Sequence, residues 1–231
     1  MSTINERSFE GFSDETIDFL KNLKENNNKS WFEENKEKYI HHLLTPMKYF
    51  VMDLSSFILS IDPLLEVTPS SGYTISKIYR DTRFSKDKSP YKIRMWITFK
   101  RRSKEWSSNP AFFFELSPDS YRYGMGFFQA NPTTMKIFRE NIDTSLDKFK
   151  NAISFYSKQD VFVVEGDKYK RILDKEKTED INEWYQRKNL YLVCNKEIDN
   201  LLFSKELVDK LIADFALVKD FYSYLYDISN K

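Results

Sequence analysis

The sequence contains few of the residues on which disulfides, metal centres and histidine-based active sites are built. Cys194 is the only cysteine in 231 residues, so the chain cannot form an internal disulfide or a four-thiolate metal site. His41 and His42 are the only histidines, and adjacent side chains diverge on a helix instead of forming an i,i+4 metal-binding pair. We therefore expect no metal, no cofactor, and no Ser-His-Asp or Cys-His catalysis.

Glycine and long apolar runs are also scarce. Of the five glycines, Gly124 and Gly126 supply only two of the three in a dinucleotide-binding fingerprint, and no GxxxxGK[ST] phosphate loop is present. The most apolar stretch, residues 50–61, is interrupted by Asp53 and three serines, whereas a membrane span needs roughly 18 apolar residues. The first ten residues lack the apolar run of a signal peptide. The sequence predicts a soluble, cytoplasmic protein with no membrane partner.

Apolar spacing of three and four residues predicts helices at both ends of the chain. Ser13 is placed to cap a first helix that ends at residues 26–28, and a second helix begins at about residue 30. Pro46 starts or kinks a third segment with a broad apolar stripe. Towards the C-terminus, helices are expected after Asn131, through Phe149 to Tyr156, near 178–187, and after Ser204.

Apolar alternation predicts strands in the middle of the chain, at 75–80, 92–99, 111–117 and 121–129, with shorter strands at 161–165 and 190–194. Short connections between the first four strands are typical of an antiparallel meander. No repeat or linker is visible in the sequence. We expect one α+β domain over residues 1–231, with a central antiparallel meander sheet packed by N-terminal and C-terminal helices.

Charge is balanced over the whole chain but not along it. Lysine and arginine number 36 against 35 acidic residues, a net charge of +1. Residues 77–104 hold eleven cations against Asp81 and Asp87, so this segment carries +9 and the remainder −8. Such asymmetry points to a local anionic partner rather than adhesion through bulk charge.

The basic segment contains a connection of some eleven residues, from about Asp81 to Tyr91, which is longer than a usual hairpin loop. Arginine forks and lysine charges suit phosphate or carboxylate groups. The candidate ligand-binding residues are Arg80, Asp81, Arg83, Lys88, Tyr91 and Lys92. In one interpretation they hold a small phosphate- or carboxylate-bearing ligand, and Tyr91 orients it or moves a proton.

Three other interpretations remain open. Arg80, Asp81, Arg83 and Asp87 can instead form an ion-pair network that holds the loop on the sheet. The basic loop and the 100–104 cluster can also bind nucleic acid, with Tyr91, Trp96 or Trp106 stacking on bases. Finally, the basic face can meet an acidic protein. The sequence identifies no reaction and no oligomeric state.

Two motifs make the sequence recognisable: Ile78-Tyr79-Arg80-Asp81-Thr82-Arg83-Phe84, and Lys86-Asp87-Lys88-Ser89-Pro90-Tyr91-Lys92. Further matching stretches are Phe12…Phe19-Leu20…Asn26-Asn27…Trp31-Phe32 and Gly124-Met125-Gly126 followed by Arg139. In these the chain resembles a bacterial and fungal family of conserved hypothetical proteins, a domain of unknown function whose arginine–aspartate–threonine–arginine–phenylalanine loop ends in proline–tyrosine–lysine. The resemblance covers about residues 12–225. It implies a single domain and a distinctive loop but no reaction, because the family has no established activity.

Overall fold

A computed structural model of the chain describes residues 8–103 and 106–229. The strands are β1 Met95–Phe99, β2 Pro110–Leu116, β3 Ser120–Phe127, β4 Val163–Glu165 and β5 Tyr191–Glu197. The α-helices are α1 Asp14–Glu25, α2 Lys29–Glu34, α3 Lys36–Lys38, α4 Thr45–Ile61, α5 Pro132–Thr144, α6 Leu146–Ala152, α7 Glu179–Tyr185 and α8 Glu206–Ser229. A π-helix, η1, spans Tyr39–Leu44, and 3-10 turns span η2 Trp106–Ser108 and η3 Tyr156–Lys158.

The five strands form one sheet in the order β1-β2-β3-β5-β4. β4 and β5 pair antiparallel, with Val163 opposite Val193 and Glu165 opposite Tyr191. The α+β class with an antiparallel sheet, predicted from the sequence, is confirmed. The meander extends only over β1, β2 and β3, because β5 lies between β3 and β4. No helix within the described ranges combines the length and the apolar character needed to cross a membrane.

The contacts divide the chain into two compact units. The first contains the residues up to Phe99, Phe114–Arg122 and Asn195–Ile212, and the second contains Lys100–Phe113, Tyr123–Cys194 and the residues from Ala213 onward. The division falls within β2, β3 and β5, so each of these strands contributes residues to both units. The single domain expected from the sequence stays a prediction.

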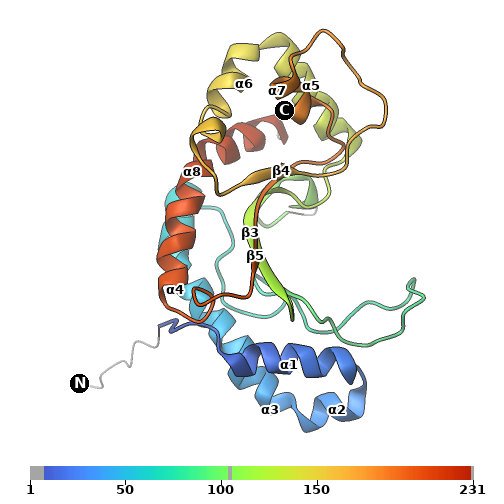
Figure 1. Cartoon of the computed structure of the whole chain (residues 1–231), viewed down its shortest axis with the longest axis vertical. Helices are drawn as coiled ribbons and strands as arrows, with labels where there is room; N and C mark the ends of the chain where they lie inside the picture. Colours follow the sequence, from blue (N-terminus) through green and yellow to red (C-terminus); the bar gives the residue numbers. More distant parts are fainter. Residues whose placement is uncertain (1–7, 104–105, 230–231) are drawn as a thin grey trace. The chain divides into compact units, whose positions relative to one another are not determined.

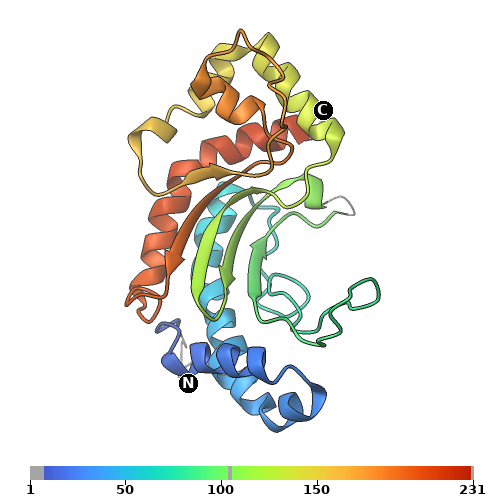
Figure 2. The same ribbon diagram turned by 45° about the vertical axis from the view of Figure 1, so that its right-hand side comes forward.

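The helices of the first unit begin where the sequence provides caps. At the start of α1, the Ser13 backbone N–H donates to Thr16 Oγ1 at 3.1 Å. At the start of α2, Asn28 Oδ1 accepts the Trp31 N–H at 3.1 Å. α4 carries Pro46 in its first turn, and because proline has no backbone N–H, it donates no helical bond to the His42 carbonyl four residues earlier. Figures 1 and 2 both show α1 lying beside α2 and α3.

The second helix expected from about residue 30 is divided into pieces. α2 is followed by α3 and then by the wider turn of η1, in which the Thr45 N–H donates to the Ile40 carbonyl. The Thr16 hydroxyl of α1 donates to the His42 carbonyl at 2.5 Å. A side chain from another helix therefore satisfies a carbonyl that would otherwise need a helical N–H. Since Pro46, four residues after His42, has no backbone N–H, the Thr16 hydroxyl takes the place of a helical donor here.

The prediction of a strand at 75–80 is wrong. That segment makes only isolated bridges, from Ile75 to Ser71 and to Ile97 and from Tyr79 to Tyr91. The Trp96 N–H donates to Ser76 Oγ at 3.1 Å instead of to a backbone carbonyl, and this side-chain bond interrupts the regular ladder. β1 is correspondingly shorter than the strand predicted there.

Each unit has an aromatic core against the sheet. In the first unit, the ring centroid of Phe114 on β2 lies 5.7 Å from that of Phe12 and 5.0 Å from that of Phe50 on α4. In the second unit, Phe112 on the same strand lies 5.0 Å from Phe215 on α8. An N-terminal and a C-terminal helix therefore both pack on the sheet, as the sequence predicts.

The helices α5 and α8 also begin near the expected caps. Asn131 Oδ1 accepts the Thr134 N–H at 2.7 Å where α5 begins. In the first unit, Ser204 Oγ accepts the Glu206 N–H at 3.2 Å where α8 begins. Local polar chemistry thus sets the start of both helices.

Candidate functional site

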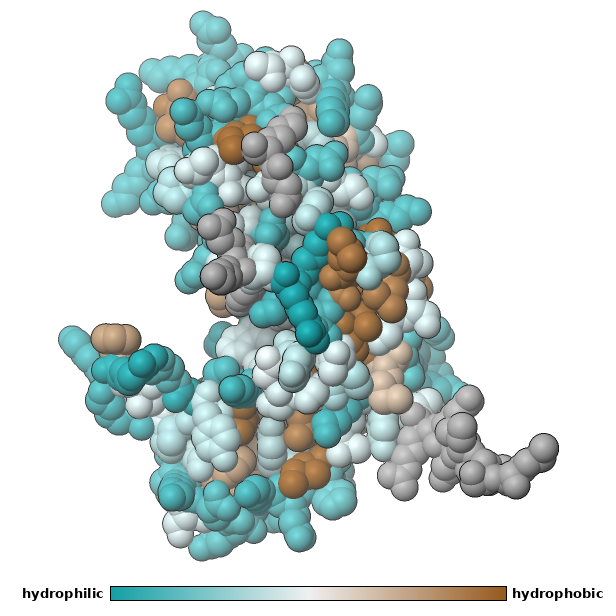
Figure 3. Space-filling model, turned by 180° about the vertical axis from the view of Figure 1, so that it is seen from behind, coloured by the Kyte–Doolittle hydropathy of each residue, from teal (hydrophilic) through white to brown (hydrophobic). Residues whose placement is uncertain are grey.

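Residues 80–90 form a long loop whose two ends are joined through the backbone. The Arg80 N–H donates to the Pro90 carbonyl, and the Lys92 N–H donates to the Ile78 carbonyl, each at 2.8 Å. Figures 1 and 2 show the loop extending away from the helices and strands of its own unit. In Figure 3 the same segment forms a largely hydrophilic projection at the left edge. The closed base therefore fixes both ends while the middle of the loop reaches into solvent.

Tyr91 anchors the second end of the loop in the core. It is 2% exposed, and its ring stacks on Phe32 of α2 with 4.1 Å between centroids. The Asn27 side chain binds both backbone groups of Tyr91, donating to the carbonyl at 2.9 Å and accepting from the N–H at 3.0 Å. Burial raises the pKa of the Tyr91 hydroxyl above its ordinary value. Tyr91 is thus suited to positioning the loop and poorly suited to transferring a proton at neutral pH.

Ion pairs within the loop engage most of its charged side chains. Arg83 is bound by the Asp81 carboxylate through two bonds, with Nε 3.0 Å from Oδ1 and Nη2 2.6 Å from Oδ2. Arg80 pairs with Asp87, which also accepts from the backbone N–H of Ser89 at 2.9 Å. The Arg83 guanidinium lowers the pKa of Asp81 to about 2, and bonds from Ser89 and Arg80 hold the pKa of Asp87 well below its usual range. Both carboxylates are ionised at neutral pH and committed to holding the loop.

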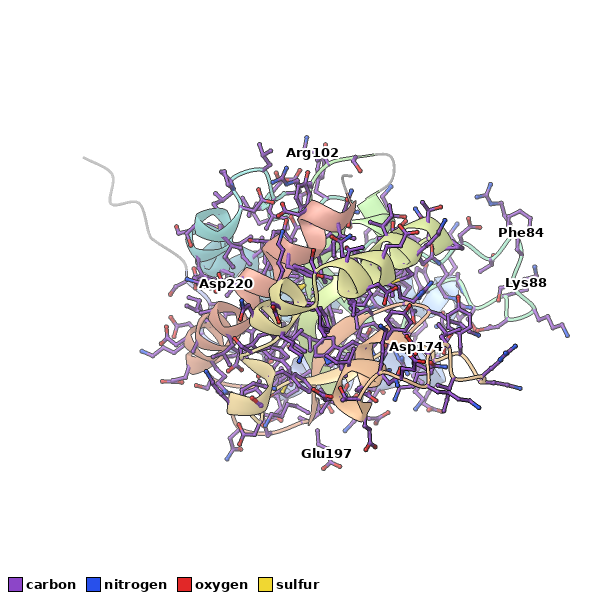
Figure 4. All side chains as sticks on the ribbon, turned by 90° about the horizontal axis from the view of Figure 1, so that it is seen from above. Phe84, Lys88, Arg102, Asp174, Glu197 and Asp220 are labelled. Atoms are coloured by element: carbon purple, nitrogen blue, oxygen red, sulfur yellow. The ribbon has the colours of Figure 1, made fainter. Side chains whose placement is uncertain are left out.

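The outer part of the loop points away from the rest of the unit. Figure 4 shows Phe84 and Lys88 at the margin of the molecule. Phe84 is 95% exposed, and Lys88 Nζ donates to the Thr82 carbonyl at 2.9 Å. Lys88 and the Asp81–Arg83 pair therefore shape the projecting part of the loop.

A hollow of about 480 Å³ lies at the base of the loop, and we call it the basal hollow. Four cations line it, Lys24, Arg80, Lys92 and Arg94, against the single carboxylate of Asp87. Tyr91 and Trp96 provide its aromatic walls. A ligand in this hollow would meet an excess of positive charge beside aromatic surface.

Lys92 is the cation of the basal hollow without a counter-ion among the residues that the structure describes. By contrast, Lys24 lies 3.7 Å from Asp119, Arg94 lies 3.7 Å from Glu115, and Arg80 pairs with Asp87. The Lys92 ammonium lies over the ring of Trp96, 5.7 Å from the centroid. Partial burial lowers the pKa of Lys92 below its ordinary value, because desolvation disfavours the charged amine. An anion placed beside Lys92 would raise the pKa again, because it stabilises the charged amine.

A buried carboxylate behind Trp96 was missed by the sequence analysis. Glu115 on β2, whose side chain is 5% exposed, accepts from Trp96 Nε1 and from Arg122 Nη2, the latter at 2.9 Å. Side chains at these positions of β1, β2 and β3 share the face of the sheet opposite the core. A glutamate at the end of the apolar run Phe112-Phe113-Phe114 was the available signal, because an acidic residue in such a strand needs partners.

The structure divides the six candidate residues into two groups. Arg80, Tyr91 and Lys92 line the basal hollow. The other three, Asp81, Arg83 and Lys88, make contacts within the loop itself. The ion pairs that the sequence offered as an alternative are therefore present, and they coexist with a basic hollow.

The basic residues after β1 belong to the second unit. Arg101 Nη1 donates to the Tyr226 hydroxyl at 2.7 Å, and its guanidinium lies 3.8 Å from the centroid of that ring. Arg102 is exposed and is labelled in Figure 4. Lys104 and the Trp106 side chain, which the sequence analysis included in a nucleic-acid surface, lie outside the described residues. The predicted basic segment is thus split between two units after Phe99.

Comparison with known proteins identifies a family and no activity. No curated protein matches the chain. A family model described as conserved hypothetical protein (DUF2461) matches residues 15–224, close to the 12–225 range of the resemblance seen in the sequence. Because this match covers most of the 231 residues, the chain belongs to the DUF2461 family of conserved hypothetical proteins.

Proposed function

We propose that this chain binds a small anionic ligand, bearing a phosphate or carboxylate group, in the basal hollow. The observation that carries the proposal is the partly buried Lys92 ammonium, which has no carboxylate partner among the described residues. Removing an ammonium from water without a counter-ion costs free energy, and a bound anion offsets that cost. Lys24 and Arg94 reinforce the attraction, since each is paired only loosely, at 3.7 Å.

The six candidate residues have two roles in this proposal. Lys92 contacts the anion, Arg80 lines the hollow beside it, and Tyr91 forms part of the wall. Asp81, Arg83 and Lys88 maintain the shape of the loop above. The proposal includes no reaction, because Asp81 and Asp87 are committed to arginines and the tyrosine is buried.

Thermal unfolding at fixed ionic strength tests the proposal, with inorganic phosphate and citrate as probes and sodium chloride as the reference salt. Binding to the folded state stabilises it by about 2.7 kcal/mol when the free ligand is 100 times its Kd. We expect at least one probe to raise Tm relative to chloride, and Lys92→Met to abolish that rise. The matched control is Lys86→Met, which removes the same charge from an exposed position of the same loop outside the hollow. A rise in Tm that survives Lys92→Met, or no rise with either probe, contradicts the proposal.

Single-stranded nucleic acid is a second candidate ligand, and one side chain favours it. Phe84 is 95% exposed between the exposed cations Arg83 and Lys86, an arrangement suited to stacking on an unpaired base. A labelled single-stranded oligonucleotide should then bind with steep salt dependence and weaken at least about five-fold with Phe84→Ser. Phe128→Ser is the control, because Phe128 is also largely exposed, at 61%, and lies outside the loop. Equal binding by both variants rejects this candidate.

A further inference from the structure

Trp96 brings a large aromatic surface to the basal hollow. Its neighbours along β1, Met95 and Ile97, are 0% exposed, whereas Trp96 is half-buried and lines the hollow. Side chains alternate across a strand, so Trp96 lies on the face of the sheet opposite the core. Tryptophan gains most of its favourable free energy from burial, and a ligand in the hollow would cover the part left exposed here.

Glu115 fixes the orientation of the Trp96 indole. The buried carboxylate accepts a hydrogen bond from Nε1, while Arg122 at 2.9 Å and Arg94 at 3.7 Å compensate its charge. Because the polar edge of the indole is held against Glu115, Trp96 presents ring carbon to the hollow. An aromatic surface held in one orientation loses little conformational freedom when a ligand stacks on it.

Charge and aromatic surface lie side by side in the basal hollow. The Lys92 ammonium is 5.7 Å from the centroid of the Trp96 ring. The hollow has a volume of about 480 Å³, and one water occupies about 30 Å³ of liquid, so an inorganic anion leaves most of it unfilled. We infer that the natural anion carries a planar aromatic ring, as a nucleoside monophosphate does, with the ring stacked on Trp96 and the phosphate on Lys92. This inference rests on the proposed function and names its class of ligand.

The uncharged side chains of Asn27 and Ser89 in the hollow are already engaged, which limits how the ring is recognised. The Asn27 amide is bonded to the backbone of Tyr91 on both sides, and Ser89 Oγ donates to Asp87 at 2.6 Å. Stacking area, rather than base-specific hydrogen bonding, then decides affinity. We expect AMP and GMP to bind about equally and both more tightly than CMP or UMP.

The test compares AMP with ribose 5-phosphate, which differ in the base, by titration calorimetry on the full chain at fixed ionic strength. Stacking of one base strengthens binding by roughly five-fold or more. We therefore expect AMP to bind at least about five times more tightly than ribose 5-phosphate. Trp96→Leu should bring this ratio close to one, because it removes the aromatic surface on which the base stacks.

A second variant keeps the test decisive if Trp96→Leu does not fold. Trp96→Phe retains a ring but loses the indole, so AMP should still bind more tightly than ribose 5-phosphate. Quenching of tryptophan emission by AMP, expected in the unmodified chain, should disappear in this variant. Equal affinities for AMP and ribose 5-phosphate in the unmodified chain overturn the inference and leave anion binding intact. Binding of neither probe, nor of inorganic phosphate, overturns both proposals.

Discussion

Charged side chains in the loop and at its base differ in what neutralises them. Asp81 and Arg83 form a fully local pair in the solvent, and both side chains remain more than half exposed, at 57% and 77%. Lys92 is partly buried and has no such partner among the described residues. Exposed pairs of this kind contribute little to global stability, and an unpaired buried charge opposes it. Substitutions at these residues should therefore separate loop structure from ligand binding.

Replacing Lys92 tests whether this residue serves folding or binding. We expect Lys92→Met to keep the free energy of unfolding within about 0.5 kcal/mol or to raise it slightly, because the variant removes a desolvated charge and keeps an apolar stem. Urea unfolding monitored by circular dichroism measures the change. Tyr91→Ala is the contrasting variant, since it removes a ring that is 2% exposed and stacked on Phe32. A loss of more than about 1 kcal/mol in Lys92→Met would assign Lys92 a structural role.

The Asp81–Arg83 pair should be visible in an acid titration. Because the guanidinium lowers the pKa of Asp81 to about 2, below the unfolded value of about 3.9, the pair stabilises the loop above pH 4. This contribution is lost as the pH falls from about 4 towards 2. The carboxyl carbon resonance of Asp81, followed by NMR, should titrate near 2 in the native chain and at a clearly higher pH in Arg83→Gln, which keeps only the bond from the backbone N–H of residue 83. Lys86→Gln should leave it unchanged, and a native value near 3.9 contradicts the pair.

Whole elements were predictable where one local pattern determined them. The caps Ser13 and Asn131 lie directly before α1 and α5, and Ser204 lies two residues before the first residue of α8. The alternation in β1 matches its buried face. The 75–80 segment was not predictable, because its ladder is interrupted by a bond between Ser76 and Trp96 that depends on tertiary structure. Sequence periodicity indicates which face of a strand is buried. It does not indicate whether a backbone N–H will bond to a backbone carbonyl or to a side chain.

In the candidate site too, contacts between neighbouring residues could be predicted from the sequence, and contacts between strands could not. Asp81 and Arg83 are two residues apart, so their pairing could be anticipated from the sequence. The Trp96–Glu115–Arg122 row joins three strands, and its existence depends on their order in the sheet. The location of Lys92 near Trp96 similarly depends on how the chain leaves the loop and enters β1. The loop could be predicted from its residue types, whereas the hollow depends on the order of the strands in the sheet.

Two glycines allow a test of how closely β3 and β5 approach. A Cβ on Gly124 would lie 1.9 Å from the Leu192 carbonyl oxygen, so the strands need a residue without a side chain there. We expect Gly124→Ala to cost about 3 kcal/mol or more of unfolding free energy, measured by urea denaturation. Gly72→Ala is the control, because at φ +88 its Cβ would meet only the flexible Lys77 side chain. It should cost about 1 kcal/mol, from backbone strain alone. Similar costs for the two variants would refute the close approach.

At the scale of the whole molecule, the boundary between the two compact units runs through strands instead of linkers. β2 changes unit after Phe113, β3 after Arg122 and β5 after Cys194. Domain boundaries ordinarily fall in exposed connections that few contacts cross. A boundary that cuts three strands of one sheet is therefore unlike the boundary between independent domains, and the single domain expected from the sequence remains our proposal.

Calorimetry decides whether the chain unfolds as one cooperative unit. We expect one transition whose calorimetric enthalpy equals its van't Hoff enthalpy, because neither unit can unfold without breaking the strands that it shares with the other. Phe32→Leu in the first unit and Phe149→Leu in the second each alter a side chain no more than 1% exposed, and each should lower this one transition by about 2–4 °C per kcal/mol lost. Two transitions, of which each variant shifts only one, would instead make the units independent domains. The shared strands would then connect the two units covalently without coupling their unfolding.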